Sequence, residues 1–555
     1  MDDDGDVAVG VPAGTVDDLG TGPPAPTVMA TGRLVRSSAV VAVGTALSRV
    51  TGLVRTSVLV GVFGIGALTD AYNVASNTPH IIYELILGGI LSATLVPIFV
   101  EQAERDDPDG ASAIVTVTMI ALVVLTLGGV LAAPLIIRIY TWAKPAEEAA
   151  EQAAVAVPLM RMFVPQMLLY GITALATALL NARRRYLAPA YSPILNNIVV
   201  VAMLLAAPVV AGRALTFDVV RDRPGLQLLL GLGTTAGVVA MTIPLVPAVR
   251  RAGWRLRWNP AWRHPAVGEV VRLSGWTVGY VIANQVALAI VLALANRNEG
   301  QVAAYTTAFV FFQLPHGLIA VSFMTTFVPE LAAAANDRAW ATYRSRFSLG
   351  IRLMALLILP AGVGYALLSR PLVGVLLERG QFDAADSALT ADVLANFAIG
   401  LLGFSVYLFA LRGFYALRDT RTPFILNVIE NAVNVVLAVA LVGRYGAPGL
   451  ALAYAIAYLV SACLALAVLR RRVSGIDGRR LATSSLRLVG ATAVMGLAVW
   501  GVTRGVGGDS GTAALARIGV AVPVGVVVYG LALVAVRAEE LRGLRSQVAS
   551  RRRVA

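Results

Sequence analysis

The sequence contains little cysteine, histidine, lysine or charge. Cys463 is the single cysteine of 555 residues, so one chain can form neither a disulfide nor a thiolate metal site. Because Cys463 lies within an apolar run, we expect it in the core. The three histidines are scattered, and no Gly-rich nucleotide loop of the Lys-Ser/Thr type is present. We therefore expect that the protein is not an enzyme and has no cofactor. Any energy for its work would come from the membrane potential or from a monovalent cation.

Charged residues make up 14% of the chain and hydrophobic residues 57%, and the mean hydropathy is +0.75. This composition is far from that of soluble domains. We count about fourteen apolar runs, each long enough for a helix across the hydrocarbon core. We therefore predict an all-α polytopic membrane protein. The runs lie near residues 38–63, 73–101, 112–140, 153–180, 190–211, 226–250, 268–295, 302–334, 347–377, 391–416, 424–442, 447–470, 483–504 and 512–536.

The net charge of +13 does not indicate nucleic-acid binding, because its arginines gather in alternate loops. Arginine excess in every second loop is the positive-inside pattern. It predicts a multi-pass protein of the cytoplasmic (inner) membrane with both termini in the cytoplasm. The arginine-rich segments are residues 183–185, 250–263, 338–346, 418–421, 470–480 and 537–553.

An internal repeat divides the chain into two related halves. Pro79-His80 opens a segment that ends at Val96-Pro97, and roughly 235 residues later Pro315-His316 opens one that ends at Val328-Pro329. Residues 180–185 are matched in the same way by residues 415–418. Paired repeats are typical of transporters whose halves rock around a central site.

The repeat and the composition suggest boundaries. We expect a disordered cytoplasmic tail, a first half with six spans, a linker, a second half with six spans, two further spans and a basic cytoplasmic tail. The linker interleaves arginine with tryptophan, which favours either a membrane-surface segment or a recognition surface for a cytoplasmic partner. The corresponding ranges are 1–32, 33–252, 253–266, 267–472, 473–537 and 538–555.

The first span carries two arginines, Arg49 and Arg55. A charge at the bilayer centre costs roughly 2.5–3.5 kcal/mol on insertion scales. Ser48, Gly52 and Arg55 form one stripe of a helix, and Arg49 is displaced toward the same half of it. Either both arginines snorkel to the cytoplasmic surface, or they form a cationic lining that binds an anionic headgroup, since guanidinium matches phosphate with paired donors.

Two acidic residues lie close to this span. Glu84, in the second span, either neutralises an arginine of the first span or changes partner or protonation during transport. Asp70 lies at the outer end of the first span or the start of the second, where it either caps a helix or contributes to the substrate site.

The eleventh span offers polar side chains at helical spacings of three and four. They point to an ion or gating site, or to hydrogen bonds between packed helices. The fifth span has Asn196 and Asn197 at the corresponding place. The residues of the eleventh span are Asn427, Glu430, Asn431 and Asn434.

Two segments resemble the MurJ (MviN) family, and the resemblance covers residues of about 35 to 540. The first is Ala46-Leu47-Ser48-Arg49-Val50-Thr51-Gly52-Leu53-Val54-Arg55, followed by Phe63-Gly64, Thr69-Asp70-Ala71-Tyr72 and Val96-Pro97. The second is Gly413-Phe414-Tyr415-Ala416-Leu417-Arg418-Asp419-Thr420-Arg421-Thr422-Pro423.

The resemblance implies a lipid II flippase of the multidrug/oligosaccharidyl-lipid/polysaccharide (MOP) exporter superfamily. It implies two six-helix lobes around a cationic cavity, with two extra helices forming a groove for the polyprenyl tail. Lipid II, membrane lipids and cell-wall synthesis proteins are the implied partners. Arg49, Arg55 and Asp70 match family positions tied to function.

The chain departs from many members at two places. In span 2, those members have an arginine pair and an acidic residue; the matching positions here are Tyr83, Glu84 and Gly88. In span 8, they have an Asp-Arg pair and a Glu; the matching positions here are Phe309, Val310 and Gln313. The low lysine content and the Ala/Val-rich composition fit an actinobacterial-type branch with its own version of the site. Arg49 and Arg55 would then carry more of the pyrophosphate binding, helped by Arg161 or Arg352 if either faces inward.

We therefore expect a flippase that moves lipid II to the outer leaflet by alternating access, for cell-wall synthesis. A flippase for another polyprenyl-linked glycan would use the same fold. A cation or drug antiporter of the same superfamily would need a cavity dominated by acidic residues. A non-transporting cell-wall scaffold would tolerate neutral residues at Arg49 and Arg55.

Overall fold

The computed structural model describes residues 28–85, 95–105, 108–538 and 540, and every regular element within these ranges is a helix. The first half of the chain forms α1 (Val28–Phe63), α2 (Ala67–Leu85), α3 (Val96–Glu104), α4 (Pro108–Tyr140), α5 (Ala146–Phe163), α6 (Gln166–Ala182), α7 (Leu187–Ala211), α8 (Phe217–Arg221), α9 (Pro224–Thr242) and α10 (Leu245–Arg251). The second half forms α11 (Pro265–Ala295), α12 (Gln301–Pro315), the π-helix η2 (His316–Ala320), α13 (Val321–Asn336), α14 (Trp340–Leu377), α15 (Ala384–Ile399), α16 (Leu401–Ala416), α17 (Arg421–Arg472), α18 (Gly478–Gly505) and α19 (Gly511–Ala535).

The all-α membrane fold predicted from composition is confirmed. Among the described residues, eleven helices are long and apolar enough to cross a membrane, and counting the bent pair α15–α16 makes twelve. The 52-residue α17 contains two of the predicted runs, joined at the non-helical Gly446. The predicted run 73–101 covers α2 and α3, with residues 86–94 between them outside the described ranges. The helix count thus agrees with about fourteen spans.

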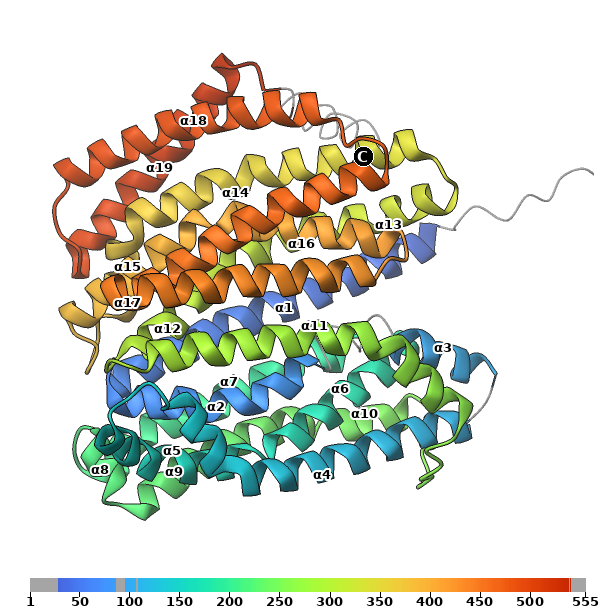
Figure 1. The fold of residues 1–555 in the computed structure, drawn as a ribbon, viewed down its shortest axis with the longest axis vertical. Coiled ribbons are helices and arrows are strands. Elements are labelled where there is room, and N and C mark those ends of the chain that lie inside the picture. Colours follow the sequence, from blue (N-terminus) through green and yellow to red (C-terminus); the bar gives the residue numbers. More distant parts are fainter. Residues whose placement is uncertain (1–27, 86–94, 106–107, 539, 541–555) are drawn as a thin grey trace, which may run out of the picture.

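The helices form two groups that lie side by side, with α1, α11 and α12 between them (Figure 1). Most of α2–α10 lie in one group and α13–α19 in the other. The central helix α1 packs on α7 and also contacts α12 and α14, while α11 contacts both α4 and α17. The arginine-rich loops lie at the end that carries α3 and the α13–α14 turn, which we call the arginine-rich end. The α8 side is the opposite end.

One landmark of the repeat has the same backbone in both halves. Arg184 and Arg418 both adopt left-handed conformations, with φ of 55° and 58°. In each turn the next residue donates its N–H to a carbonyl five residues back: Arg185 to Leu180 at 2.8 Å and Asp419 to Phe414 at 3.0 Å. This is the hydrogen bond of a Schellman motif, so the sequence match at this place is also a structural match.

One expectation about a single residue was wrong, and the tryptophans of the linker differ in exposure. Cys463 is exposed on α17 rather than buried, because an apolar run in a membrane protein can face lipid as well as core. Trp254, a tryptophan of the linker in which a membrane-surface segment was one expectation, is buried, and its Nε1 donates to the Leu179 carbonyl at 2.9 Å. Trp258 and Trp262 of the same linker are exposed, as a membrane-surface segment requires.

Candidate functional site

Both arginines of α1 lie well inside the length of that helix. At 1.5 Å per residue, Arg49 is roughly 21 Å and Arg55 roughly 12 Å from the end at Phe63. For a hydrocarbon core of about 30 Å this depth puts Arg55 in the interior of the membrane. Among the described residues neither guanidinium has a carboxylate within ion-pair distance. Whether Glu84 neutralises either arginine lies outside the described residues, and binding of an anionic headgroup stays a prediction.

The two arginines face different halves of the molecule. Arg55 lies within electrostatic range of Tyr72 on α2, whose hydroxyl is 2.8 Å from the Thr234 hydroxyl. Arg49 instead lies against η2 of the second half, where a Cβ built on Gly317 would be 2.6 Å from its guanidinium carbon. The sequence placed Arg49 toward the same half of the helix as Ser48 and Arg55, but its guanidinium contacts the second half of the molecule, because α1 lies between the two halves.

Asn197 holds α1 against α7. Its Nδ2 donates to the Ser48 carbonyl at 3.2 Å and to the Thr51 hydroxyl at 2.9 Å. The Ser48 carbonyl is therefore engaged in helix packing, which also explains Asn197 without an ion site.

Asp70 caps a helix of the opposite half. Its Oδ2 accepts the Gly300 N–H at 2.7 Å and its Oδ1 accepts the Ala303 N–H at 2.8 Å. Both donors belong to the first turn of α12, where the helix dipole favours a negative charge. Asp70 is fully buried. Both carboxylate oxygens are thus occupied, and any substrate-binding role of Asp70 stays a prediction.

Further polar contacts join the halves around this cap at the opposite end. They pair the end of α1, the α1–α2 turn and α2 with the α11–α12 turn, α12, α15 and the segment before α15. They are Ile65 N–H to Asp386 Oδ2 at 3.1 Å, Ala67 N–H to Glu299 Oε1 at 3.0 Å, Gln381 N–H to the Gly61 carbonyl at 2.9 Å, and Asn73 Nδ2 to Thr306 Oγ1 at 3.1 Å. This end of the molecule is closed by hydrogen bonds that run from one half to the other.

The polar residues of the eleventh span meet a partner that sequence reasoning missed. Asn427 and Asn431 both donate to Asn284 Oδ1 of α11 at 2.9 Å. Asn284 was recognisable only as a polar residue within an apolar run. Both carboxylate oxygens of Glu430 and the Oδ1 of Asn434 are buried and have no hydrogen-bond partner among the described residues. These buried oxygens are unsatisfied acceptors of the kind that bind a hard cation or a proton.

The remaining expected residues lie elsewhere. Phe309 packs into an aromatic cluster with Phe312, Phe397 and Tyr454, so this departure from the family pattern fills the core of the second half. Gln313 is exposed and Val310 half-buried. The side chains of Tyr83 and Glu84, and all of Gly88, lie outside the described residues.

Arg352 does not supplement the α1 arginines. Its Nη1 forms an ion pair with Glu540 at 3.0 Å, and Glu540 also accepts the Ser484 hydroxyl at 2.6 Å. The side chains of Arg352 and Glu540 are 12% and 2% exposed. Arg352 thus joins α14 to α18 and to the chain after α19.

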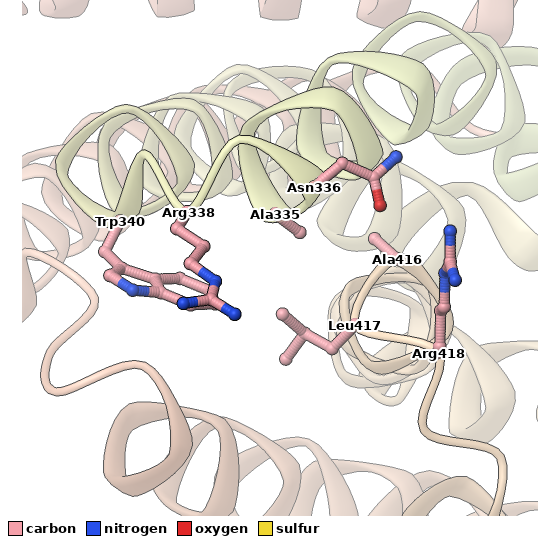
Figure 2. Close-up of a pocket in the computed structure, with 7 residues that line it drawn as sticks. All are labelled: Ala335, Asn336, Arg338, Trp340, Ala416, Leu417 and Arg418. Carbon is pink, nitrogen blue, oxygen red and sulfur yellow. The ribbon is translucent and has the colours of Figure 1, made fainter.

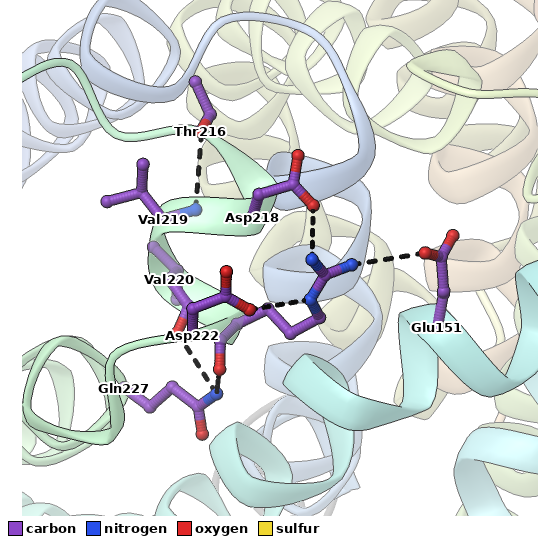
Figure 3. A network of polar contacts seen from close by, with 8 residues as sticks. Glu151, Thr216, Asp218, Val219, Val220, Asp222 and Gln227 are labelled. Atoms are coloured by element: carbon purple, nitrogen blue, oxygen red, sulfur yellow. Dashed lines mark hydrogen bonds and ion pairs between the residues drawn. The ribbon is translucent and has the colours of Figure 1, made fainter.

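The described pockets and surface networks do not include the α1 arginines. An open pocket of about 520 Å³ at the arginine-rich end has Arg338 and Trp340 on one side and Arg418 on the other, across an apolar floor (Figure 2). At the opposite end, Arg221 of α8 pairs with Asp218, Asp222 and Glu151 at 2.9–3.2 Å (Figure 3). This exposed network ties α8 to α5.

Comparison with known proteins decides the family. The family model described as lipid II flippase MurJ matches residues 59–519. The chain belongs to the MurJ family. A probable lipid II flippase MurJ of Rhizobium meliloti (strain 1021) is 30% identical over 475 residues, which covers 84% of this chain and 86% of the relative. A MurJ relative of Synechocystis sp. is 30% identical over 479 residues, covering 84% and 87%.

Solved structures share the MurJ fold. A lipid II flippase MurJ in an inward closed conformation superposes with a TM-score of 0.74 at 20% identity, covering 90% of this chain and 98% of that one. An inward-facing multidrug resistance MATE family transporter of the MOP superfamily superposes with a TM-score of 0.63 at 15% identity, covering 78% and 96%. The fold is therefore one that is similar in these MurJ and MATE transporters, as the sequence resemblance implied.

Proposed function

We propose that this MurJ-family chain moves lipid II from the inner to the outer leaflet of the cytoplasmic membrane by alternating access, for cell-wall synthesis. The family match over residues 59–519 is the observation that carries the proposal. A disaccharide-peptide pyrophosphate cannot cross hydrocarbon unaided, because its charges and amides would lose their hydration. Arg49 and Arg55, which have no described carboxylate partner, supply the cationic grip for the pyrophosphate.

The charge distribution supports an orientation. The arginine-rich end faces the cytoplasm, together with both termini. The end closed by Asp70 and its neighbouring contacts then faces outward, and lipid II enters from the cytoplasmic side. Release requires those contacts between the halves to break while the cytoplasmic side closes.

The exposed apolar faces of α18 and α19 suit the polyprenyl tail. Leu486, Leu497, Val526 and Leu531 are each at least 65% exposed, so these helices present apolar side chains to lipid. The tail stays in hydrocarbon along α18–α19 while the headgroup passes between the halves.

A cation or proton bound at Glu430 couples transport to the ion gradient. The support is its buried carboxylate, which lies about one helical turn from Asn427 and from Asn434, whose buried Oδ1 atoms also have no partner among the described residues. Thermal unfolding of the purified protein in NaCl, KCl and choline chloride tests this. We expect one metal cation, or acidic pH, to raise the Tm of the wild type and to leave that of Glu430→Gln unchanged. Equal Tm shifts in both proteins would remove Glu430 from the coupling site.

The central test is complementation of a flippase-depleted strain, with outer-leaflet lipid II and membrane expression scored together. We expect the wild type to rescue and Arg49→Ala and Arg55→Ala to fail at equal expression. Arg105→Ala is the matched control, because Arg105 forms an exposed ion pair with Glu101 and should be dispensable.

The other outcomes separate the rivals. Rescue by both α1 variants would leave the fold assignment intact but would contradict the proposal that Arg49 and Arg55 bind the pyrophosphate. Failure of the well-expressed wild type would favour a flippase for another polyprenyl-linked glycan. Transport of a drug or cation by the wild type in vesicles, without lipid II movement, would favour an antiporter.

A further inference from the structure

The contact between Arg49 and Gly317 is the place where the first span reaches the second half at mid-depth. A Cβ built on Gly317 would lie 2.6 Å from Arg49 Cζ and 2.9 Å from Nη2. No real Cβ is found so close to other heavy atoms, so the guanidinium occupies the space that any side chain at position 317 would need. Arg49 approaches η2 this closely because residue 317 is glycine.

The backbone at this place is unusual. Residues 316–320 form a π-helix, closed by the Val321 N–H donating to the His316 carbonyl. It follows Pro315, which has no N–H to continue the ladder of α12. Single-turn π-helices inside α-helices occur frequently at functional sites. The wide turn therefore coincides with the point of contact with Arg49.

The neighbouring His316 is fixed and turned into the second half. Its Nδ1 lies 3.0 Å from the Ser405 hydroxyl, and its ring packs edge-on against Phe404 at 4.6 Å. The His316 ring therefore has its own partners on α16. Position 317, not 316, presents its face to α1.

We propose that Gly317 is a positioning residue that forms the seat of the Arg49 guanidinium. The inference rests on the proposed function. It names the feature of the second half that positions Arg49, one of the two arginines proposed to bind the pyrophosphate. At this contact the second half contributes the space and α1 contributes the charge.

Two properties of Gly317→Ala follow from this geometry. The atoms that its methyl group would meet are the far end of a flexible side chain, so Arg49 moves and the backbone does not. Alanine is also the better helix former. We therefore expect Gly317→Ala to unfold at the same temperature as the wild type or higher, and yet to bind lipid II about tenfold more weakly, the loss of one charge-assisted contact.

The test measures lipid II binding to purified protein and thermal unfolding in parallel. Gly364→Ala is the matched control: Gly364 is also half-buried in a helix of the second half, but a Cβ there meets nothing within 4 Å. It should keep wild-type affinity. Arg49→Lys replaces the planar guanidinium with a compact ammonium group, so it should weaken lipid II binding in the wild-type background. Combined with Gly317→Ala, it should reduce the affinity by a smaller factor or not at all.

The possible results distinguish a failure of the Gly317 proposal from a failure of the proposed lipid II function. No binding by the wild type would overturn the proposed function. Binding lost in Arg49→Ala but retained in Gly317→Ala would overturn the seat alone. A lowered Tm in Gly317→Ala would also overturn it, because the methyl group would then be displacing packed structure rather than a guanidinium. Additive effects of Gly317→Ala and Arg49→Lys would do the same.

Discussion

At the residue scale, single polar side chains form hydrogen bonds that connect parts of the chain far apart in the sequence. Asp70 uses both oxygens to cap α12, 230 residues further along. A carboxylate at a helix N-terminus gains from two charge-assisted hydrogen bonds and from the helix dipole. The closure of the opposite end therefore includes two hydrogen bonds to one buried side chain.

Asp70→Asn should weaken this closure. The amide keeps one oxygen acceptor but turns an NH2 group toward a backbone N–H, and removing a partner from a buried hydrogen bond costs about 1–3 kcal/mol. We expect a lower Tm and a loss of complementation. Asp222→Asn changes an exposed carboxylate and should shift stability by less than about 0.5 kcal/mol. A Tm equal to that of the wild type would mean that the cap does not hold the halves together.

At the element scale, α17 shows how a backbone break makes two spans from one helix. Gly446 has φ 58° and ψ −141°, a region that only glycine occupies readily. Gln301 of α12 reaches this break, since its Oε1 accepts the Ala447 N–H. The break between the two spans of α17 thus involves the backbone conformation of Gly446 and the hydrogen bond from Ala447 N–H to the Gln301 side chain.

Gly446→Ala should cost about 1–3 kcal/mol of stability, because alanine is strained in this conformation and its Cβ would lie 2.7 Å from Gln301 Oε1. Gly443→Ala, three residues earlier on the same helix, meets nothing within 4 Å and should be neutral or stabilising. Thermal unfolding of both proteins checks the expectation. Equal effects at the two positions would contradict it.

The buried Arg352–Glu540 pair adds to the apolar packing that attaches α18 and α19 to α14. Removing one member leaves an uncompensated buried charge, which costs about 3–5 kcal/mol. We expect Glu540→Leu to lower the Tm strongly and Arg352→Leu/Glu540→Leu to recover much of it. A double-mutant cycle measures the coupling. Additive single effects would show that the pair does not join these helices.

At the scale of the whole molecule, the halves are joined at one end by contacts that alternating access requires to break. Asn73 on α2 and Thr306 on α12 make one such contact at 3.1 Å. The wild-type chain has one exposed cysteine, Cys463, which Cys463→Ser removes for cross-linking experiments.

A short thiol cross-linker between Asn73→Cys and Thr306→Cys should stop lipid II transport, and reduction should restore it. The pair Thr173→Cys and Thr242→Cys, whose native hydroxyls lie 2.9 Å apart within the first half, should cross-link without stopping transport. Undiminished transport by fully cross-linked Asn73→Cys/Thr306→Cys would show that this end does not open.

The sequence by itself determined the membrane-spanning helices, the repeat, the two arginines of α1 and the family. Hydropathy, arginine distribution and short motifs are local, so they are readable along the chain. Tertiary structure alone decided that Asp70 caps α12, that Asn284 meets Asn427 and Asn431, and that Arg352 pairs with Glu540. It also decided that Cys463 faces outward. Lipid tails are as apolar as the core, so hydropathy does not tell which face of a helix meets another helix or which distant polar group it meets.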